Sequence, residues 1–327
     1  RMGKKPLFYA MDKGKLIFAS ELKGLLRIHH VPPSLNVEAL HYYFRLGFIH
    51  NWMSIYHNVH KLPPGHWLQW SVREQRVIAQ NPYWQLPDAE FDYTSSEHEW
   101  IERIDELLDD ATRIRLRSDV PLGIFLSAGI DSGLVAAAAA KAVDNTAGLP
   151  SLTVSLPGWE KDEWPLASQV GRHLGLTAVH RELDPESMKN LPALAAHFDE
   201  PFSDHSMIPA FLICKAARER MTVVLSGDGG DELFAGYQNH LRAYRYRTLE
   251  RIPAPVRTLM AALGRSVTRP DSAPRRFLNR LPQPAGFYGL GAKVYLFEEW
   301  LQELIKKEFY FPDRKSTRLN SSHGKLS

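Results

Sequence analysis

Serine, glycine and aspartate residues between two apolar segments could bind a phosphate group. The apolar run Leu122–Leu126 predicts a buried strand, and the Ala-rich run Gly133–Val143 predicts a helix. The residues between them include Ser127, Gly129, Asp131 and Ser132. A loop that joins a strand to a helix presents backbone N–H groups and the positive end of the helix dipole, so an anion is the expected ligand. Gly/Ser-rich turns also occur as plain connections between a strand and a helix. When this loop is considered by itself, a purely structural role therefore stays open.

The aspartate in this loop implies a cation as well. The carboxylate of Asp131 would repel a bound phosphate unless a divalent metal ion lay between them, so the sequence predicts Mg²⁺ together with the phosphate. No lysine follows the glycine, and the chain contains no G-x-x-x-x-G-K-S/T motif. These absences exclude a P-loop kinase or GTPase.

A second apolar run leads into a similar loop. Met221–Leu225 predicts another strand, and it is followed by Ser226-Gly-Asp-Gly-Gly-Asp-Glu-Leu-Phe-Ala-Gly-Tyr237. Loops that leave the carboxyl ends of parallel strands share one edge of the sheet, where open α/β sheets bind their ligands. The two loops are therefore expected to face the same ligand.

The pattern Ser-x-Gly-x-Asp-Ser at 127–132 resembles the pyrophosphate loop of the ATP pyrophosphatase superfamily, whose members cleave ATP between its α and β phosphates. Together with the second loop, it resembles the asparagine synthetase family of glutamine-dependent amidotransferases. The resemblance covers roughly residues 3 to 313 and is most specific from 118 to 237. It implies an α/β fold, in which a parallel-sheet, adenine-nucleotide α-hydrolase-like synthetase domain follows the C-terminal part of an α+β N-terminal-nucleophile glutaminase domain.

The resemblance also implies roles for individual residues. ATP contacts are expected at Leu126, Ser127, Gly129, Asp131, Ser132, Val154, Ser155, Ser226 and Gly227. Asp131 and Asp231 would hold Mg²⁺ on the pyrophosphate, and Asp228 would act as a base for ammonia or as an orienting group. Asp204 and Ser206 are expected to contact the substrate. The alternatives are plain structural roles, since acids at a helix entry are usually caps and β-branched strand residues are usually core.

The reaction implied by the resemblance converts aspartate to asparagine. The aspartate carboxylate attacks the α phosphorus of ATP to give β-aspartyl-AMP and pyrophosphate, and ammonia derived from glutamine then displaces AMP. Ala128 replaces a glycine that is usual in the first loop, while Asp228 and Gly230 stand where asparagine synthetase proper more often has Glu and Ser. Three alternatives therefore stay open: an amidotransferase or a β-lactam-synthetase-like enzyme that acts on another carboxylate, and an inactive nucleotide-binding fragment.

The elements that position these residues fall into two predicted domains. Residues 1–86 alternate short strand patterns with turns and resemble the closing part of the glutaminase domain, and 87–96 is a polar linker. Residues 97–313 alternate helices and strands, which predicts a doubly wound parallel sheet in an incomplete synthetase domain. The tail 314–327 is predicted to be disordered, with a cloning or assembly artefact as one explanation of its sequence.

The family's nucleophile has no counterpart in this chain. That nucleophile is an amino-terminal cysteine, whereas position 1 here is arginine, so glutaminase activity is not expected of this chain. Cys214 is its only cysteine and is expected to be a small core residue. No segment matches the family's downstream catalytic lysine.

Composition sets the expected compartment and partners. The 327 residues carry a formal net charge of +3 and one cysteine, which excludes an intramolecular disulfide and suits a reducing compartment. No apolar run approaches the ~20 residues of a membrane span. Ten arginines between Arg242 and Arg280 are attributed to surface helices rather than to nucleic-acid binding. A cytoplasmic enzyme of small molecules (ATP, aspartate, and glutamine or ammonia) is expected, without nucleic acid or membrane partners; a homodimer is left open.

Overall fold

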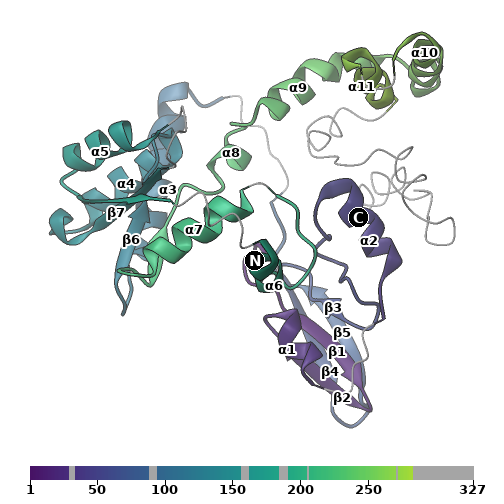
Figure 1. The fold of residues 1–327 in the computed structure, drawn as a ribbon, viewed down its shortest axis with the longest axis horizontal. Helices are drawn as coiled ribbons and strands as arrows, with labels where there is room; N and C mark the ends of the chain where they lie inside the picture. Colours follow the sequence, from purple (N-terminus) through teal and green to yellow (C-terminus); the bar gives the residue numbers. More distant parts are fainter. Residues whose placement is uncertain are drawn as a thin grey trace. The chain divides into compact units, whose positions relative to one another are not determined.

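The computed structural model describes residues 1–28, 34–87, 94–155, 162–183, 191–204, 206–269 and 272–282 (Figure 1). The chain divides into two compact units. The first unit comprises Arg1–Asp88, Pro192–Asp204 and Gly291–Ser327, the last of which lies outside the described residues. The second unit comprises Ala89–Leu191 and His205–Leu290. A short segment from the second half of the sequence therefore belongs to the amino-terminal unit.

The first unit contains two small antiparallel sheets. One has the strand order β2-β1-β3, formed by Lys15–Ala19, Phe8–Asp12 and His60–Lys61. The other pairs β4 (His66–Ser71) with β5 (Arg76–Pro82). The turn between β1 and β2 places Lys13 and Gly14 at positive φ, which matches the right-handed twist of a tight hairpin. The alternation of short strands and turns expected for residues 1–86 is confirmed, whereas the two-residue β3 is too short to be detected from its sequence.

Two helices complete the described core of the first unit. Helix α1 spans Leu22–Leu26, and α2 spans Val37–Leu46, as its pattern predicts. Asn36 caps α2 by accepting a hydrogen bond from the backbone N–H of Ala39 at 3.1 Å. The apolar core of this unit consists of Phe8, Ala10, Leu22, Leu25, Ala39, Ile49, Ile55 and Val59.

The second unit is built on a parallel sheet of four described strands. They are β6 (Leu122–Phe125), β7 (Pro150–Ser155), β8 (Thr177–Glu182) and β9 (Val223–Leu225), in the order β8-β7-β6-β9. Every neighbouring pair in this sheet is parallel. The expected parallel α/β sheet is confirmed, and it brings the ends of β6 and β9 side by side.

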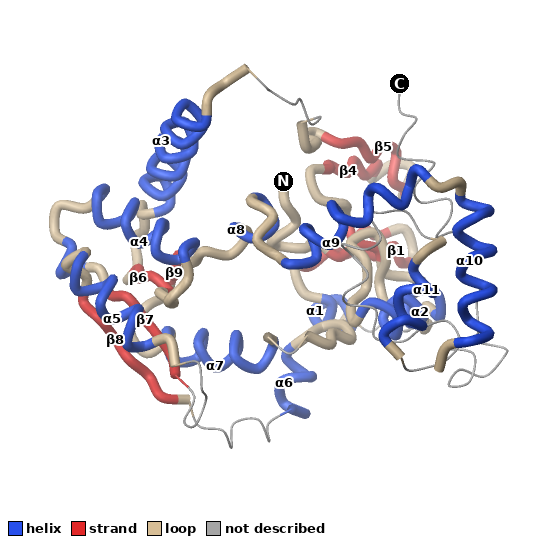
Figure 2. Tube along the Cα trace, turned by 90° about the horizontal axis from the view of Figure 1, so that it is seen from above, coloured by secondary structure: helices blue, strands red, loops and turns tan. Residues whose placement is uncertain are grey.

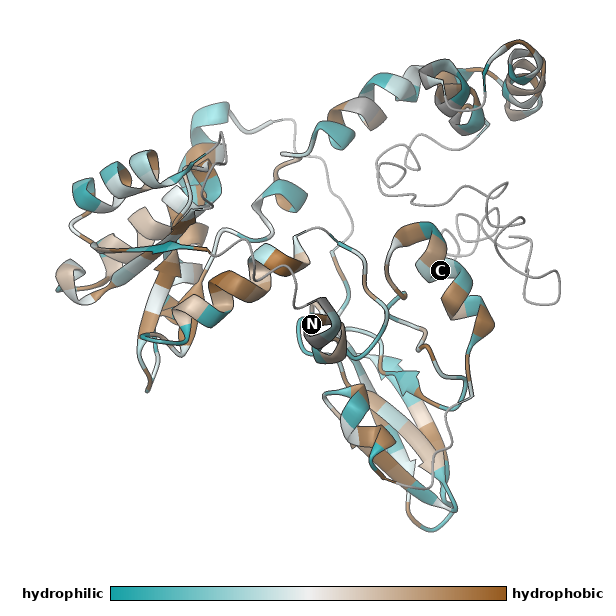
Figure 3. Ribbon diagram, in the orientation of Figure 1, coloured by the Kyte–Doolittle hydropathy of each residue, from teal (hydrophilic) through white to brown (hydrophobic). Residues whose placement is uncertain are grey.

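Helices cover both faces of this sheet (Figures 1 and 2). Helices α4 (Ile130–Ala142) and α5 (Trp164–His173) supply Ala136, Ala139 and Ala167 to the core that contains Ile124 of β6. Helix α7 (Met207–Ala217), strongly apolar along its length in Figure 3, packs against the opposite face, which includes Phe125. Since neighbouring strand residues point to opposite faces, Ile124 contacts the layer of α4 and α5, and Phe125 contacts the layer of α7.

Helix α3 (Glu97–Arg115) precedes the sheet and packs against α4. Its start is fixed by a capping box, in which Ser96 Oγ accepts from the N–H of Glu99 and Glu99 accepts from the N–H of Ser96. Lys141 of α4 pairs with Asp105 and Asp109 of α3.

The remaining described elements are short or lie late in the chain. They are η1 (Thr146–Gly148), α6 (Leu191–His197), α8 (Gly230–Leu233), α9 (Gln238–Tyr246), η3 (Arg247–Arg251), α10 (Ala254–Val267) and α11 (Ala273–Arg280). The Arg-rich segment is helical, but Arg257 is buried and donates to the carbonyls of Ile252 and Leu281 rather than lying on the surface.

Several predictions concern residues outside this description. Most of the linker at 87–96 and the whole tail at 314–327 lie outside the described residues. The predicted domain boundaries stay predictions. Among the described helices, none is both long and apolar enough to cross a membrane.

Candidate functional site

The loop after β6 is closed by its own serine side chains. Helix α4 begins at Ile130 with Gly129 as its N-cap, so the prediction that it begins at Gly133 was wrong. The reason lies in Ser132, whose Oγ accepts from the N–H of Ser127 at 3.1 Å and lies 2.7 Å from Ser127 Oγ. These bonds tighten the turn and bring Ser132 and Asp131 into the first turn of the helix.

The same loop retains the features of an anion site. The N–H groups of the first helical turn have no acceptor within the helix, and they point outward from its amino-terminal end. Ser127 Oγ accepts from the N–H of Gly129 at 3.0 Å, which fixes the approach to α4. Ala128 has no positive φ, so alanine is accommodated without backbone strain where the family usually has glycine.

Leu126 is held within the sheet. Its N–H donates to the carbonyl of Leu152 at 3.0 Å, and its carbonyl accepts from the hydroxyl of Thr153 at 2.7 Å. Its side chain is buried in the core. Thr153 was not among the residues predicted from the sequence, although a hydroxyl within an apolar strand indicates a hydrogen bond to the main chain. A nucleoside contact of Leu126 stays a prediction.

The loop after β9 contacts the first loop. A Cβ atom on Gly227 would lie 2.6 Å from the backbone nitrogen of Ser132, and one on Gly230 would lie 2.5 Å from Cγ of Asp131. Real Cβ atoms do not approach other atoms so closely, so both positions suit glycine. The structure thus brings the two loops together at Asp131, as expected of loops that leave neighbouring parallel strands.

Carboxylates gather in the second loop. Ser226 Oγ donates to Oδ2 of Asp228 at 2.8 Å, and Asp231 and Glu232 lie in the first turn of α8. The hydroxyl of Tyr237 donates to Glu232 at 2.9 Å. This hydrogen bond, followed by burial and by the charges of the surrounding carboxylates, raises the pKa of Tyr237 to about 12. The loop is therefore a region of negative potential.

The two expected metal ligands differ in their surroundings. The carboxylate of Asp131 lies against Gly230, whereas that of Asp231 lies against the backbone of Gly236. Within the described residues, no group of three or more His, Cys, Asp or Glu side chains could hold a metal ion. Two carboxylates on touching loops suit Mg²⁺ that arrives with a nucleotide and keeps phosphate and water oxygens as its other ligands.

Val154 and Ser155 lie at the end of β7, the strand beside β6. Ser155 Oγ lies 2.7 Å from Nε2 of His180 on β8. The ring of Trp164 stacks on the His180 ring, with centroids 4.3 Å apart and an interplanar angle of 13°. Neither residue was predicted from the sequence, because the pairing of β7 with β8 brings His180 to Ser155, and the placement of α5 brings Trp164 to His180.

The expected substrate contacts belong to different units. Asp204 ends the segment Pro192–Asp204 of the first unit, whereas Ser206 is the N-cap of α7 in the second. The prediction that Cys214 is a core residue was wrong, because it lies on an exposed part of α7. Partial burial of the thiol, followed by the charge of Asp228, raises the pKa of Cys214.

Comparison with known proteins agrees with this geometry. Residues 103–317 match the asparagine synthase family, and residues 1–84 match a glutamine amidotransferase domain. A Methanocaldococcus jannaschii protein, provisionally named asparagine synthetase (glutamine-hydrolyzing) 2, is 37% identical over 268 residues, which cover 80% of this chain and 51% of that protein. Asparagine synthetase (glutamine-hydrolyzing) 1 of Bacillus subtilis is 31% identical over 263 residues, covering 79% of this chain and 40% of that protein.

A fungal relative carries a different name. Amidase chyE of Penicillium rubens is 30% identical over 257 residues, which cover 72% of this chain and 37% of that protein. The chain spans about half the length, or less, of the curated relatives described here. The match over residues 103–317 includes both loops that meet at Asp131, and through it the chain belongs to the asparagine synthase family.

Proposed function

We propose that this protein takes part in ATP-dependent formation of asparagine from aspartate, with ammonia derived from glutamine and with AMP and pyrophosphate as products. The observation that carries the proposal is the contact of the β6 and β9 loops at Asp131, on a parallel sheet of the asparagine synthase family. Two glycine-containing loops with three aspartates suit a nucleotide that carries a divalent cation.

The β6 loop would bind the phosphates of ATP. The N–H groups at the start of α4 would donate to phosphate oxygens, with Ser127, Gly129 and Ser132 shaping the loop around them. Asp131 and Asp231 would hold Mg²⁺, which would offset the negative charge that develops on the pyrophosphate. Because Ser132 Oγ already bonds within the loop, its backbone N–H is the better placed of its two donors.

The nucleoside would lie over the ends of the neighbouring strands. Leu126 and the main chain of Val154 and Ser155 would border one side of the nucleoside, and Ser226 and Gly227 would border the other, since β7 and β9 lie on either side of β6. Backbone groups can recognise the edge of an adenine ring without a charged side chain. The hydrogen bond between Ser155 and His180 would hold the end of β7 in place.

Asp228 would act on ammonia at the second step. Its carboxylate accepts a hydrogen bond from Ser226, which orients it at the turn after β9. A carboxylate held in this way can orient ammonia or accept a proton from it as the new C–N bond forms. Asp204 and Ser206 would contact the aspartate substrate.

Analysis of the nucleotide products tests this proposal. The purified chain is given Mg²⁺, ATP, aspartate and ammonia, and AMP with pyrophosphate is separated from ADP with phosphate. Aspartate-dependent AMP formation is expected, with loss of at least ~100-fold in Asp131→Asn and no change in Asp144→Asn, an exposed aspartate of the same unit. ADP as the product would contradict the proposal, and AMP formation only with another carboxylate would contradict aspartate as the acceptor.

A further inference from the structure

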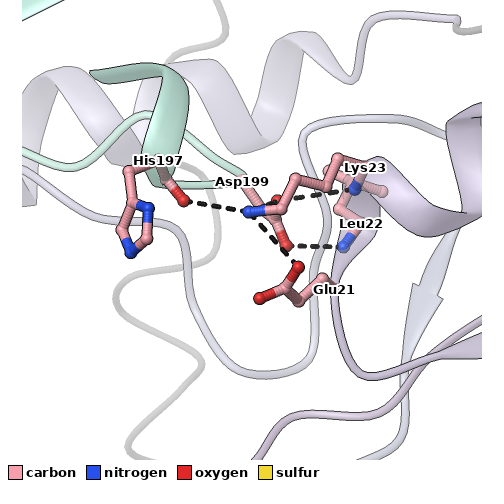
Figure 4. Close-up of polar contacts among 5 residues, drawn as sticks. All are labelled: Glu21, Leu22, Lys23, His197 and Asp199. Atoms are coloured by element: carbon pink, nitrogen blue, oxygen red, sulfur yellow. Dashed lines mark hydrogen bonds and ion pairs between the residues drawn. The ribbon is translucent and has the colours of Figure 1, made fainter. Parts of the chain in front are cut away.

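Helix α1 of the first unit begins without a cap from its own sequence. Glu21 at the N-cap makes no side-chain capping bond, and the first turn contains no acidic residue. The acceptor comes instead from Asp199, 177 positions away in the sequence. Its Oδ2 accepts from the N–H of Leu22 at 2.6 Å, and its Oδ1 lies 3.4 Å from the backbone nitrogen of Lys23 (Figure 4). Asp199 therefore performs the role of a local N-cap residue.

The lysine of this helix adds two further contacts to the same segment. Lys23 Nζ donates to the carbonyl of His197 at 3.2 Å and pairs with Asp199 at 3.4 Å (Figure 4). Burial alone would lower the pKa of Lys23, but its contacts with Glu21 and Asp199 outweigh that effect and raise it. The first turn of α1 therefore contacts His197 and Asp199, and Lys23 also forms an ion pair with Glu21.

Glu200 makes a second, more buried attachment. Its Oε1 accepts from the backbone N–H of Ile55 at 2.8 Å, and its Oε2 forms an ion pair with Lys61. The side chains of Lys61 and Glu200 are 10% and 12% exposed. When either partner of such a buried ion pair is removed, the other is left as an uncompensated charge. Separating Glu200 from Lys61 is therefore energetically costly.

A backbone contact completes the attachment. The N–H of Ser203 donates to the carbonyl of Gly47 at 2.7 Å, directly after α2. The bonded groups of the first unit belong to or adjoin its core, since Leu22 and Ile55 are core residues. The segment 197–203 is consequently fixed to three separate parts of the first unit: the start of α1, the residues around Ile55, and the end of α2.

The chain enters and leaves this segment from the second unit. Residues Ala89–Leu191, which precede this segment, and His205–Leu290, which follow it, belong to the second unit. Asp204 is the last residue of the segment, one position after Ser203. We propose that Asp199 and Glu200 are positioning residues that anchor the segment Pro192–Asp204 on the first unit and thereby place Asp204 for the amino-acid substrate. The anchoring stands by itself, whereas the role of Asp204 rests on the proposed function.

Hydrogen exchange on the full chain tests the anchoring without any turnover. Asp199→Ala should speed exchange of the Leu22 amide at least tenfold, because that N–H loses its acceptor, and Asp199→Asn should restore protection because its side-chain oxygen can still accept. Glu200→Ala should have the same effect on the Ile55 amide. Ser203→Ala is the matched control, since the segment keeps its backbone bond to Gly47. Unchanged protection of Leu22 in a folded Asp199→Ala chain would overturn the anchoring.

Steady-state kinetics with ammonia test the consequence for the substrate. In Asp199→Ala the KM for aspartate should rise at least fivefold while the KM for ATP stays unchanged, and Asp199→Asn should recover most of the loss. Faster exchange of Leu22 with an unchanged KM for aspartate would overturn the substrate role and leave the anchoring in place. If the unaltered chain gives no AMP with aspartate, the proposed function fails and the substrate role fails with it, whereas the exchange result still decides the anchoring.

Discussion

Gly227 lies so close to Ser132 that a Cβ atom on the glycine would stand 2.6 Å from the serine backbone nitrogen. This approach joins the loop after β9 to the first turn of α4, which carries Asp131. The neighbouring contact differs in kind, because a Cβ on Gly230 would meet the carboxylate of Asp131, the movable end of a side chain. The two glycines therefore give different predictions.

We expect Gly227→Ala to separate the loops and Gly230→Ala to leave them together. In Gly227→Ala the backbone of α4 or of the β9 loop has to move, so ATP binding should weaken at least ~10-fold and unfolding should be easier by ~1–3 kcal/mol. In Gly230→Ala the Asp131 side chain can rotate away, so the stability loss should stay within ~1 kcal/mol. Calorimetric ATP titration and urea unfolding of both variants measure these effects. Equal losses in the two variants would contradict the contact at Ser132.

Ser132→Ala should destabilise the second unit, although it removes only one hydroxyl group from the first turn of α4. Its hydroxyl is buried and accepts from the N–H of Ser127, so its removal leaves that donor without this partner. A buried donor without an acceptor costs ~1–3 kcal/mol. Urea unfolding should show this loss, whereas Ser118→Ala, at an exposed position before β6, should stay within ~0.5 kcal/mol. A Ser132→Ala chain as stable as the unaltered protein would show that the loop closes without this hydroxyl.

The sequence predicted those parts of the molecule that depend on local pattern. Alternating apolar segments predicted the strands β6 to β8 and the helices between them, and parallel connectivity then predicted that the two loops meet. The start of α4 was missed because the side-chain bonds of Ser132 decide it, and the exposure of Cys214 was missed because an apolar helix gives no signal of which face is covered. The contacts of Asp199 and Glu200 join positions more than a hundred residues apart, which no local pattern records.

The pH dependence of Tyr237 reports the negative charge of the β9 loop. The native pKa of about 12 lies above the ordinary value of 10, so folding favours the neutral phenol. The stabilisation is fully present below pH 10 and is lost as the pH rises through 12. Ultraviolet titration of the tyrosines should show a late ionisation near pH 12 that is absent in Tyr237→Phe. In Glu232→Ala, which removes both the hydrogen-bond acceptor and the charge of Glu232, this ionisation should move to lower pH; an unchanged titration would show that Glu232 is not the origin of the shift.

The thiol of Cys214 offers a probe of Asp228 that requires no substrate. Partial burial and the negative charge of Asp228 raise the pKa of Cys214, so less of the reactive thiolate is present at a given pH. Asp228→Asn removes the charge but keeps the shape, so the reaction with an aromatic disulfide should become faster and its pH profile should move to lower pH. Asp144→Asn, an exposed aspartate elsewhere in the same unit, should leave the profile unchanged. If Asp228→Asn also leaves it unchanged, the charge of Asp228 does not act on the thiol of Cys214, which would contradict this prediction.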